Sequence, residues 1–123
     1  MKKDVVVRVN MSTLEASRDL LPEKYLYLAG RALSSQYISD NVNPLCNPLG
    51  PHNRLVLTCG FLAGTTISSA NRLSIGAKSP LTGGIKESNA GGTAAFMMGR
   101  LGIRMITIEG IREDTSWYIL VID

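Results

Sequence analysis

A chain of 123 residues, 45% of them hydrophobic, is long enough for one domain with its own core. Thirteen Lys and Arg against ten Asp and Glu give a net charge of +3, and the basic residues are scattered singly, which argues against a nucleic-acid-binding stripe. No apolar run reaches the roughly 18 residues of a membrane span. Two cysteines and one histidine are too few for a four-ligand zinc site or an iron–sulfur cluster. We therefore expect one cytoplasmic domain over residues 1–123, with neither a membrane nor a nucleic acid as partner.

The first half of the chain predicts a strand, a helix and a loop, in that order. A β-branched run broken by one arginine predicts a strand over residues 4–10. Pro22 suits a first helical position, and apolar residues recur after it at helical spacing, so we predict a helix over residues 22–39. Gly30 falls inside this helix, where glycine costs about 1 kcal/mol relative to alanine; close packing or a ligand would explain it, or the helix is locally weak, and packing is the favoured interpretation. Three prolines then predict a loop over residues 43–51 with an exposed His52 beside it.

The second half predicts four strands, of which three are apolar runs. These runs cover residues 54–59, 103–108 and 117–122, and the last two are expected to pair antiparallel. Cys59, at the end of the first run, is expected in the core. Many strands and few helices predict an α+β domain, a mixed or antiparallel β-sheet with two main helices.

The fourth predicted strand, residues 72–78, alternates between apolar and polar side chains. Leu73, Ile75 and Ala77 share one face while polar residues share the other, as in a half-buried sheet. Arg72 and Lys78 lie at its two ends, roughly 20 Å apart at the rise of an extended strand. The two basic side chains are therefore expected to serve opposite ends of anything bound there.

A glycine-rich stretch over residues 79–92 carries the chemistry. We predict that Ser88 or Asn89 caps a helix after it, that residues 90–92 form the first turn, and that Gly99 ends the helix. Glycines at a helix start expose backbone N–H groups, and the positive end of the helix dipole favours an anion, so the stretch predicts a phosphate cradle. A tight turn with close packing of helix on sheet stays open as the alternative. The spacing fits neither a P-loop nor a dinucleotide-binding fingerprint.

The sequence from Arg72 to Gly92 resembles the N-terminal domain of the tungsten-containing aldehyde ferredoxin oxidoreductases. The most specific part is Lys-Ser-Pro-Leu-Thr-Gly from Lys78, followed by Asn-x-Gly-Gly from Asn89. The resemblance implies β-sheet that supports a tungstopterin or molybdopterin cofactor, whose two pterin phosphates are joined through magnesium. It also implies oxidation of aldehydes to carboxylates, with electrons passed to ferredoxin.

The resemblance assigns roles to particular residues. Asn89 would turn its backbone carbonyl toward magnesium, residues Ala90, Gly91 and Gly92 would line the phosphate end, and Arg72 would lie between pterin and iron–sulfur cluster. The expected cofactor-binding set is completed by Lys78 and Ser88, and no catalytic residue is expected in this chain. One departure is Ala70-Asn71-Arg72, where the family commonly has Gly-Gly-Arg.

The family's 4Fe-4S cysteines and second pterin-phosphate site lie in later domains that this chain lacks. We therefore expect the chain to be inactive alone and to depend on the remaining catalytic domains or subunit. The alternative is a stand-alone interaction or phosphate-ligand-binding module without activity. Apolar surface left bare by missing domains signals association, which leaves a homo-oligomer open. A small independent enzyme is disfavoured, because no two glutamates are paired by spacing and His52 has no evident nucleophile.

Overall fold

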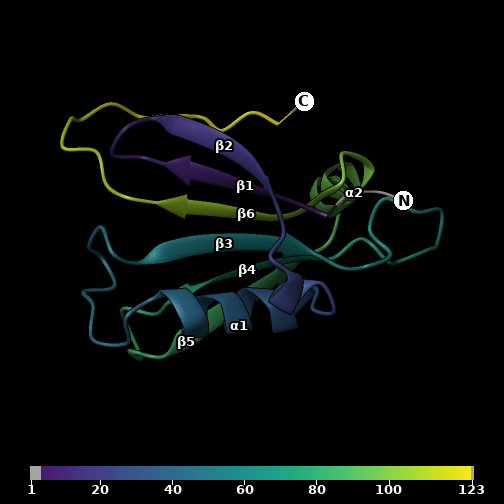
Figure 1. Ribbon diagram of the computed structural model, residues 1–123, viewed down its shortest axis with the longest axis horizontal. Coiled ribbons are helices and arrows are strands. Elements are labelled where there is room, and N and C mark those ends of the chain that lie inside the picture. Colours follow the sequence, from purple (N-terminus) through teal and green to yellow (C-terminus); the bar gives the residue numbers. More distant parts are fainter. Residues whose placement is uncertain (1–3, 123) are drawn as a thin grey trace.

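A six-stranded mixed sheet forms the centre of the computed structural model, which describes residues 4–122 (Figure 1). The strands lie in the order β2-β1-β6-β3-β4-β5, and β1 and β6 are parallel while the other neighbours are antiparallel. Two α-helices accompany the sheet. The predicted α+β fold, a mixed sheet with two main helices, is confirmed.

The four inner strands coincide with strands that the sequence predicts. Their side chains are aliphatic or β-branched on at least one face, which suits a pleated, buried surface. They are β1 (Val5–Asn10), β3 (Arg54–Cys59), β4 (Leu73–Lys78) and β6 (Ile103–Glu109).

Both edge strands were missed by the sequence pattern. They are β2 (Glu15–Leu20) and β5 (Ile85–Ala90), and almost all of their side chains are exposed. With neither face buried they carry no apolar alternation, so only pairing with β1 and β4 makes them strands.

The first helix begins later than predicted. A short 3₁₀ turn, η1 (Glu23–Tyr25), precedes α1 (Gly30–Asn41), so the prediction of one helix over residues 22–39 is wrong at its start. Gly30 is the first residue of α1 with φ +52°, and a Cβ there would meet nothing within 4 Å. Conformational freedom, not close packing, is therefore the reason for glycine at this position.

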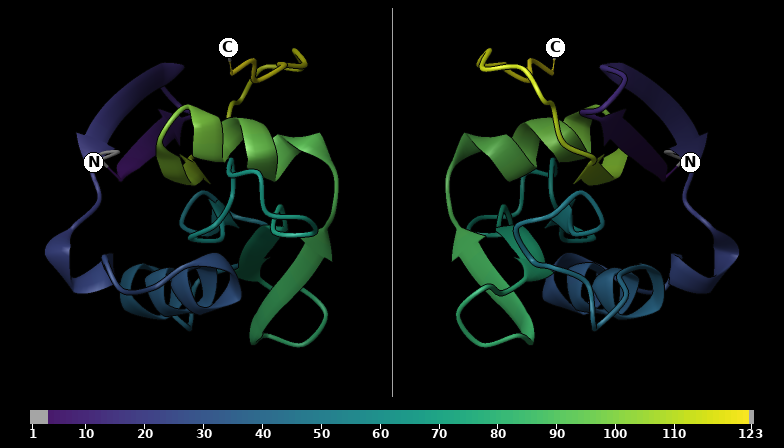
Figure 2. Two further views of the ribbon diagram at one scale, coloured as in Figure 1. Left: turned by 90° about the vertical axis from the view of Figure 1, so that its right-hand side faces the viewer. Right: turned by 90° about the vertical axis from the view of Figure 1, so that its left-hand side faces the viewer.

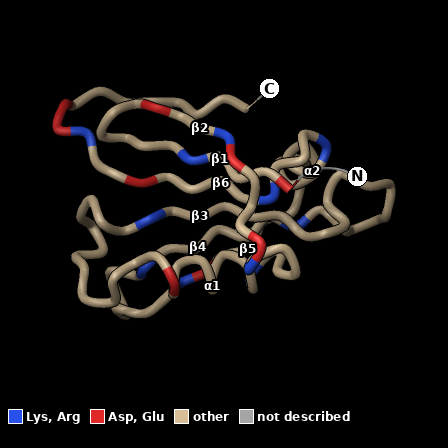
Figure 3. The backbone as a smooth tube through the Cα atoms, viewed as in Figure 1, with Lys and Arg blue, Asp and Glu red and all other residues tan. Residues whose placement is uncertain are grey.

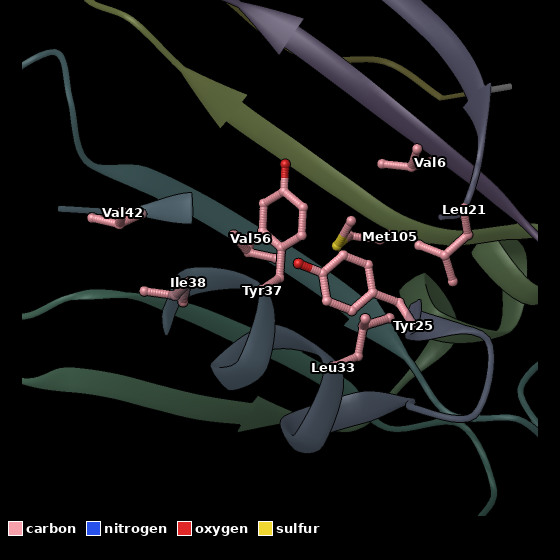
Figure 4. Close-up of a cluster of buried hydrophobic side chains, with 9 residues drawn as sticks. All are labelled: Val6, Leu21, Tyr25, Leu33, Tyr37, Ile38, Val42, Val56 and Met105. Carbon is pink, nitrogen blue, oxygen red and sulfur yellow. The ribbon is translucent and has the colours of Figure 1, made fainter. Parts of the chain in front are cut away.

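The two α-helices lie on opposite faces of the sheet (Figure 2). On one face, side chains from α1 and η1 meet those of the inner strands (Figure 4); this cluster comprises Val6, Leu21, Tyr25, Leu33, Tyr37, Ile38, Val42, Val56 and Met105. On the other face, α2 (Thr93–Arg100) packs in a cluster that comprises Cys59, Ala63, Leu73, Ala95, Met98, Ile103 and Ile106. The predicted burial of Cys59 is confirmed.

The polar face of β4 is covered, not solvated. Ser74 and Gly76 are buried beneath α1, and a Cβ on Gly76 would lie only 2.9 Å from Cδ1 of Ile38. The Oγ atoms of Ser34 and Ser74 are 3.1 Å apart and share a hydrogen bond. The prediction of a half-buried strand is wrong because α1 packs closely over small polar side chains.

Residues 111–122 form neither helix nor strand, so the predicted strand over residues 117–122 and its antiparallel pairing are wrong. The segment runs back beside β2 (Figure 1). Trp117 is 98% exposed, whereas Tyr118 and Leu120 are each 44% exposed and line a hollow that also touches Val9. An apolar run by itself does not make a strand, because it also needs a neighbour to pair with.

The loop over residues 43–51 and the exposure of His52 agree with the predictions. Acidic and basic residues are interspersed along the backbone of the fold (Figure 3). Within residues 4–122, neither α-helix has the length and apolar character that a membrane span requires.

Candidate functional site

The ends of β4 and β5 bring three of the predicted site residues together. Leu73 pairs with Ala90 at the end of the antiparallel ladder. Arg72, just before Leu73, and Gly91, just after Ala90, therefore face each other. A Cβ on Gly91 would lie 3.5 Å from Nη1 of Arg72. Together with Gly92 they line a hollow of about 330 Å³, whose other lining residues are Ser69 and Asn71.

The start of α2 opens into this hollow. Gly92 is the N-cap of α2, with φ +110° and ψ −158°, and no side chain among residues 4–122 caps the helix. The prediction that Ser88 or Asn89 caps it is wrong, because pairing with β4 keeps both residues in β5. The first N–H groups of an uncapped helix lack intrahelical partners and lie at its positive end, so they favour an anion.

Arg72 adds a full positive charge at the same place. Its side chain is exposed, and within residues 4–122 its guanidinium has no hydrogen-bond or ion-pair partner. A planar guanidinium offers several N–H donors in a geometry that matches phosphate oxygens. The site thus combines a cation that is unpaired within the described residues with bare backbone at a helix start.

Lys78 lies at the other end of β4, as the strand spacing predicts, but in different surroundings. Its side chain is 9% exposed, and Nζ donates hydrogen bonds to the backbone carbonyls of Pro44 and Cys46, the latter at 2.6 Å. Asn53 bonds to both backbone groups of Lys78, at 3.1 Å to N and 3.0 Å to O. Lys78 therefore fastens the 43–51 loop to the sheet, a contact that no local sequence signal indicates.

The predicted residues of β5 are divided between the two faces of the strand. The side chain of Asn89 donates to the Glu87 carboxylate, while Ser88, one residue before it, points to the opposite face. Glu87 was not singled out from the sequence, although it accepts a hydrogen bond from Ser74 at 2.7 Å. A glutamate in a polar stretch gives no pattern that would reveal this role.

A larger hollow, about 650 Å³, lies at the far end of the sheet and includes His52, Arg54 and Glu109. Its charges are already satisfied, because Arg54 pairs with Glu109 at 3.0 Å and donates to the Tyr37 hydroxyl at 2.8 Å. Size alone therefore does not make it the better anion site.

Side-chain metal ligands are not gathered anywhere in the part of the chain that the structure describes. No group of three or more His, Cys, Asp or Glu side chains there could hold a metal ion. The resolved pKa shifts also belong to surface clusters elsewhere: the Tyr25 hydroxyl, above all, lowers the pKa of the Asp40 carboxyl, and the Arg112 side chain lowers that of Asp114.

Comparison with known proteins decides the family. The N-terminal domain of aldehyde ferredoxin oxidoreductase matches residues 6–123. The chain belongs to this family. It is 33% identical, over 95% of its length, to the tungsten-containing aldehyde ferredoxin oxidoreductase of Thermococcus kodakarensis, and 31% identical over the same share to that of Pyrococcus furiosus. The resemblance read from residues 72–92 is thereby confirmed.

A solved structure supports the fold independently. It is the active site complex BamBC of benzoyl coenzyme A reductase with 1,5-dienoyl-CoA, which superposes with a TM-score of 0.85 at 26% identity. The match covers 93% of this chain but 18% of that one, and the curated relatives are covered over 20% of their length. The chain therefore spans about a fifth of the proteins it matches.

Proposed function

We propose that this chain is the part of an aldehyde-oxidising oxidoreductase that holds the phosphate end of a tungsten or molybdenum pterin cofactor. The observation that carries the proposal is the Arg72 guanidinium, which has no partner among residues 4–122, beside a start of α2 that none of these residues caps with a side chain. A phosphate supplies the negative charge and the acceptor oxygens that both groups lack.

The residues present fit such a group. Gly91 and Gly92 have no side chains to screen their backbone, and a Cβ on Gly92 would meet nothing in the described part of the chain within 4 Å, so there is open space beside it. In our proposal Asn89 offers its backbone carbonyl to a magnesium ion, because its side chain is held by Glu87. Ser88 and Ala90 are the exposed neighbours of Asn89 in β5 and complete the proposed phosphate end. The ammonium of Lys78 already donates to the carbonyls of Pro44 and Cys46, so in our proposal it does not bind phosphate itself. It contributes indirectly, by holding the 43–51 loop against the sheet.

When bound, the cofactor supplies the redox chemistry that converts an aldehyde to a carboxylate. This chain's residues bind and orient its phosphate end. Other domains would supply the 4Fe-4S cluster, since Cys59 is buried and Cys46 is the only other cysteine. They would also supply the contact with ferredoxin. The relatives' greater length supports such partners, and the family match disfavours a stand-alone module.

Titration of the ¹⁵N-labelled chain with inorganic phosphate tests the site. We expect the backbone amide signals of Gly91, Gly92 and Thr93 to shift. Replacing Arg72→Gln should weaken binding about tenfold, because a charge-assisted hydrogen bond is lost. Arg112→Gln is the matched control, since Arg112 is already paired with Asp114 and its loss changes the net charge equally.

Binding that is as tight in Arg72→Gln as in the wild type would contradict the proposal. So would shifts that arise elsewhere, for example around Arg54 in the larger hollow. Metal and pterin analysis of the chain co-purified with its remaining domains would then test the cofactor itself.

A further inference from the structure

Glu87 makes more side-chain contacts than any role in a solvated edge strand requires. Its side chain is 14% exposed. Oε1 accepts hydrogen bonds from Oγ of Ser74, at 2.7 Å, and from Nδ2 of Asn89, while Oε2 lies 3.9 Å from Nε of Arg31. The carboxylate thus links two neighbouring strands and the first turn of α1.

The contacts continue into the core. Ser74 Oγ lies 3.1 Å from Ser34 Oγ of α1, and both residues are buried. Among residues 4–122, β5 pairs with β4 alone, and each of its side chains except that of Glu87 is exposed. Apart from the backbone ladder, Glu87 is therefore the main attachment of β5 to the rest of the fold.

The two hydrogen-bond donors to Glu87 stand next to the candidate site. Ser74 lies two residues after Arg72, Asn89 lies two residues before Gly91, and Ser74 and Asn89 are directly paired in the ladder. Any shift between the strands at this pair would move the guanidinium away from the glycine backbone that it faces.

We infer that Glu87 is a positioning residue for the phosphate site, an inference that rests on the proposed function. Its carboxylate holds the side chains of Ser74 and Asn89 together, and so keeps Arg72 opposite Gly91. Because the Glu87 carboxylate accepts a hydrogen bond from the Asn89 side-chain amide, Asn89 would meet the ligand through its backbone and not through its side chain.

The negative charge of Glu87 and its positioning role predict opposite changes in phosphate affinity when the residue is replaced, which makes the inference testable. Glu87 is an anion, so its removal would raise the net charge from +3 to +4 and, by electrostatics alone, favour phosphate binding. If Glu87 positions the site, its removal weakens binding instead. The sign of the change therefore separates the two effects.

The experiment is the phosphate titration followed at the Gly91 and Gly92 amides. Glu87→Met should weaken binding about fivefold, because both hydrogen bonds to the side chain are lost. Glu87→Gln should stay within about twofold of the wild type, since its amide oxygen still accepts from Ser74 and Asn89. Glu15→Met is the control, with the same charge change on the other edge strand, where among residues 4–122 the Glu15 carboxylate accepts a hydrogen bond only from Thr13.

Ser74→Ala provides a second variant that alters no charge and keeps the test open if Glu87→Met does not fold. It should also weaken binding, by about two- to threefold, since one hydrogen bond is removed. Binding by Glu87→Met or Ser74→Ala equal to or tighter than the wild type would overturn the inference while the phosphate site stands. Absence of any shift at Gly91 and Gly92 in the wild type would overturn the site and the inference together.

Discussion

One basic side chain stands at each end of β4, Arg72 at its start and Lys78 at its end. They have the same charge but differ in exposure and in hydrogen-bond partners. Arg72 is exposed and has no partner among residues 4–122, while the first turn of α2 and the backbone of Gly91 lie beside it. Lys78 is buried, and its ammonium is held by the carbonyls of Pro44 and Cys46. The difference teaches that a cation is available to a ligand only where the fold leaves its donors unmet.

The comparison predicts that one end of β4 supports stability and the other supports binding. A buried ammonium with its hydrogen bonds made is costly to disturb, because the carbonyls it serves lose their partners as well. An exposed guanidinium without partners can be removed with little effect on folding. Three substitutions, from the largest expected effect to the smallest, sharpen or break this contrast.

Replacing Lys78→Met should lower the free energy of unfolding by about 2–4 kcal/mol, because two backbone carbonyls lose their donor. Chemical denaturation measures it, and Arg72→Met is the matched control, expected within about 0.5 kcal/mol of the wild type. Phosphate binding at Gly91 and Gly92 should persist in Lys78→Met wherever the protein remains folded. Equal destabilisation by the two substitutions would break the contrast.

Gly92→Ala should act at the other end. A φ of +110° is strained for any residue with a side chain, so we expect a loss of about 1–2 kcal/mol in stability. Phosphate binding should weaken as well, because the added methyl group would occupy open space that the ligand would otherwise fill. Gly84→Ala is the control, since Gly84 does not need a positive φ and its Cβ would have only Thr82 Oγ1 nearby, at 3.7 Å. Unchanged stability and binding in Gly92→Ala would argue against the site.

The smallest effect is expected at Asp40, on α1 and outside both ends of β4. Hydrogen bonds from Tyr25, then from Gln36 and Lys24, lower the pKa of its carboxyl below the ordinary 3.8. The ionised form therefore stabilises the fold above that ordinary value, and the contribution is lost as the pH falls below it through the folded pKa. Asp40→Asn should flatten the loss of thermal stability in this acid range and leave phosphate binding unchanged. An acid profile identical to that of the wild type would contradict this assignment.

Much of the sheet could be predicted, and the reason is local. The strands β1, β3, β4 and β6 bury aliphatic side chains, so their apolar runs are visible in the sequence. The edge strand β5 is polar and was hidden inside a stretch that reads as glycine-rich loop and helix cap. The prediction for residues 117–122 was wrong in the opposite sense: it expected a strand, but the apolar run has no strand to pair with in the described chain.

The candidate site divides in the same way. Gly91 and Gly92 stood out because glycines beside a helix start expose backbone, and the family resemblance pointed to Arg72. Glu87 did not stand out, because its contacts come from Ser74 and Arg31 on other elements. The tie between Lys78 and the 43–51 loop was equally invisible, since the chain separates Lys78 from Pro44 by 34 residues.

By itself the sequence determined the family, the inner strands and the bare backbone at Gly91 and Gly92, because each depends on residues close together in the chain. Only the tertiary structure decided that Arg72, and not Lys78, is free of partners within the described residues, and which carboxylate holds the edge strand β5. Those outcomes depend on hydrogen-bond partners that are distant in sequence, and a donor is satisfied or left unmet only when the elements have packed together.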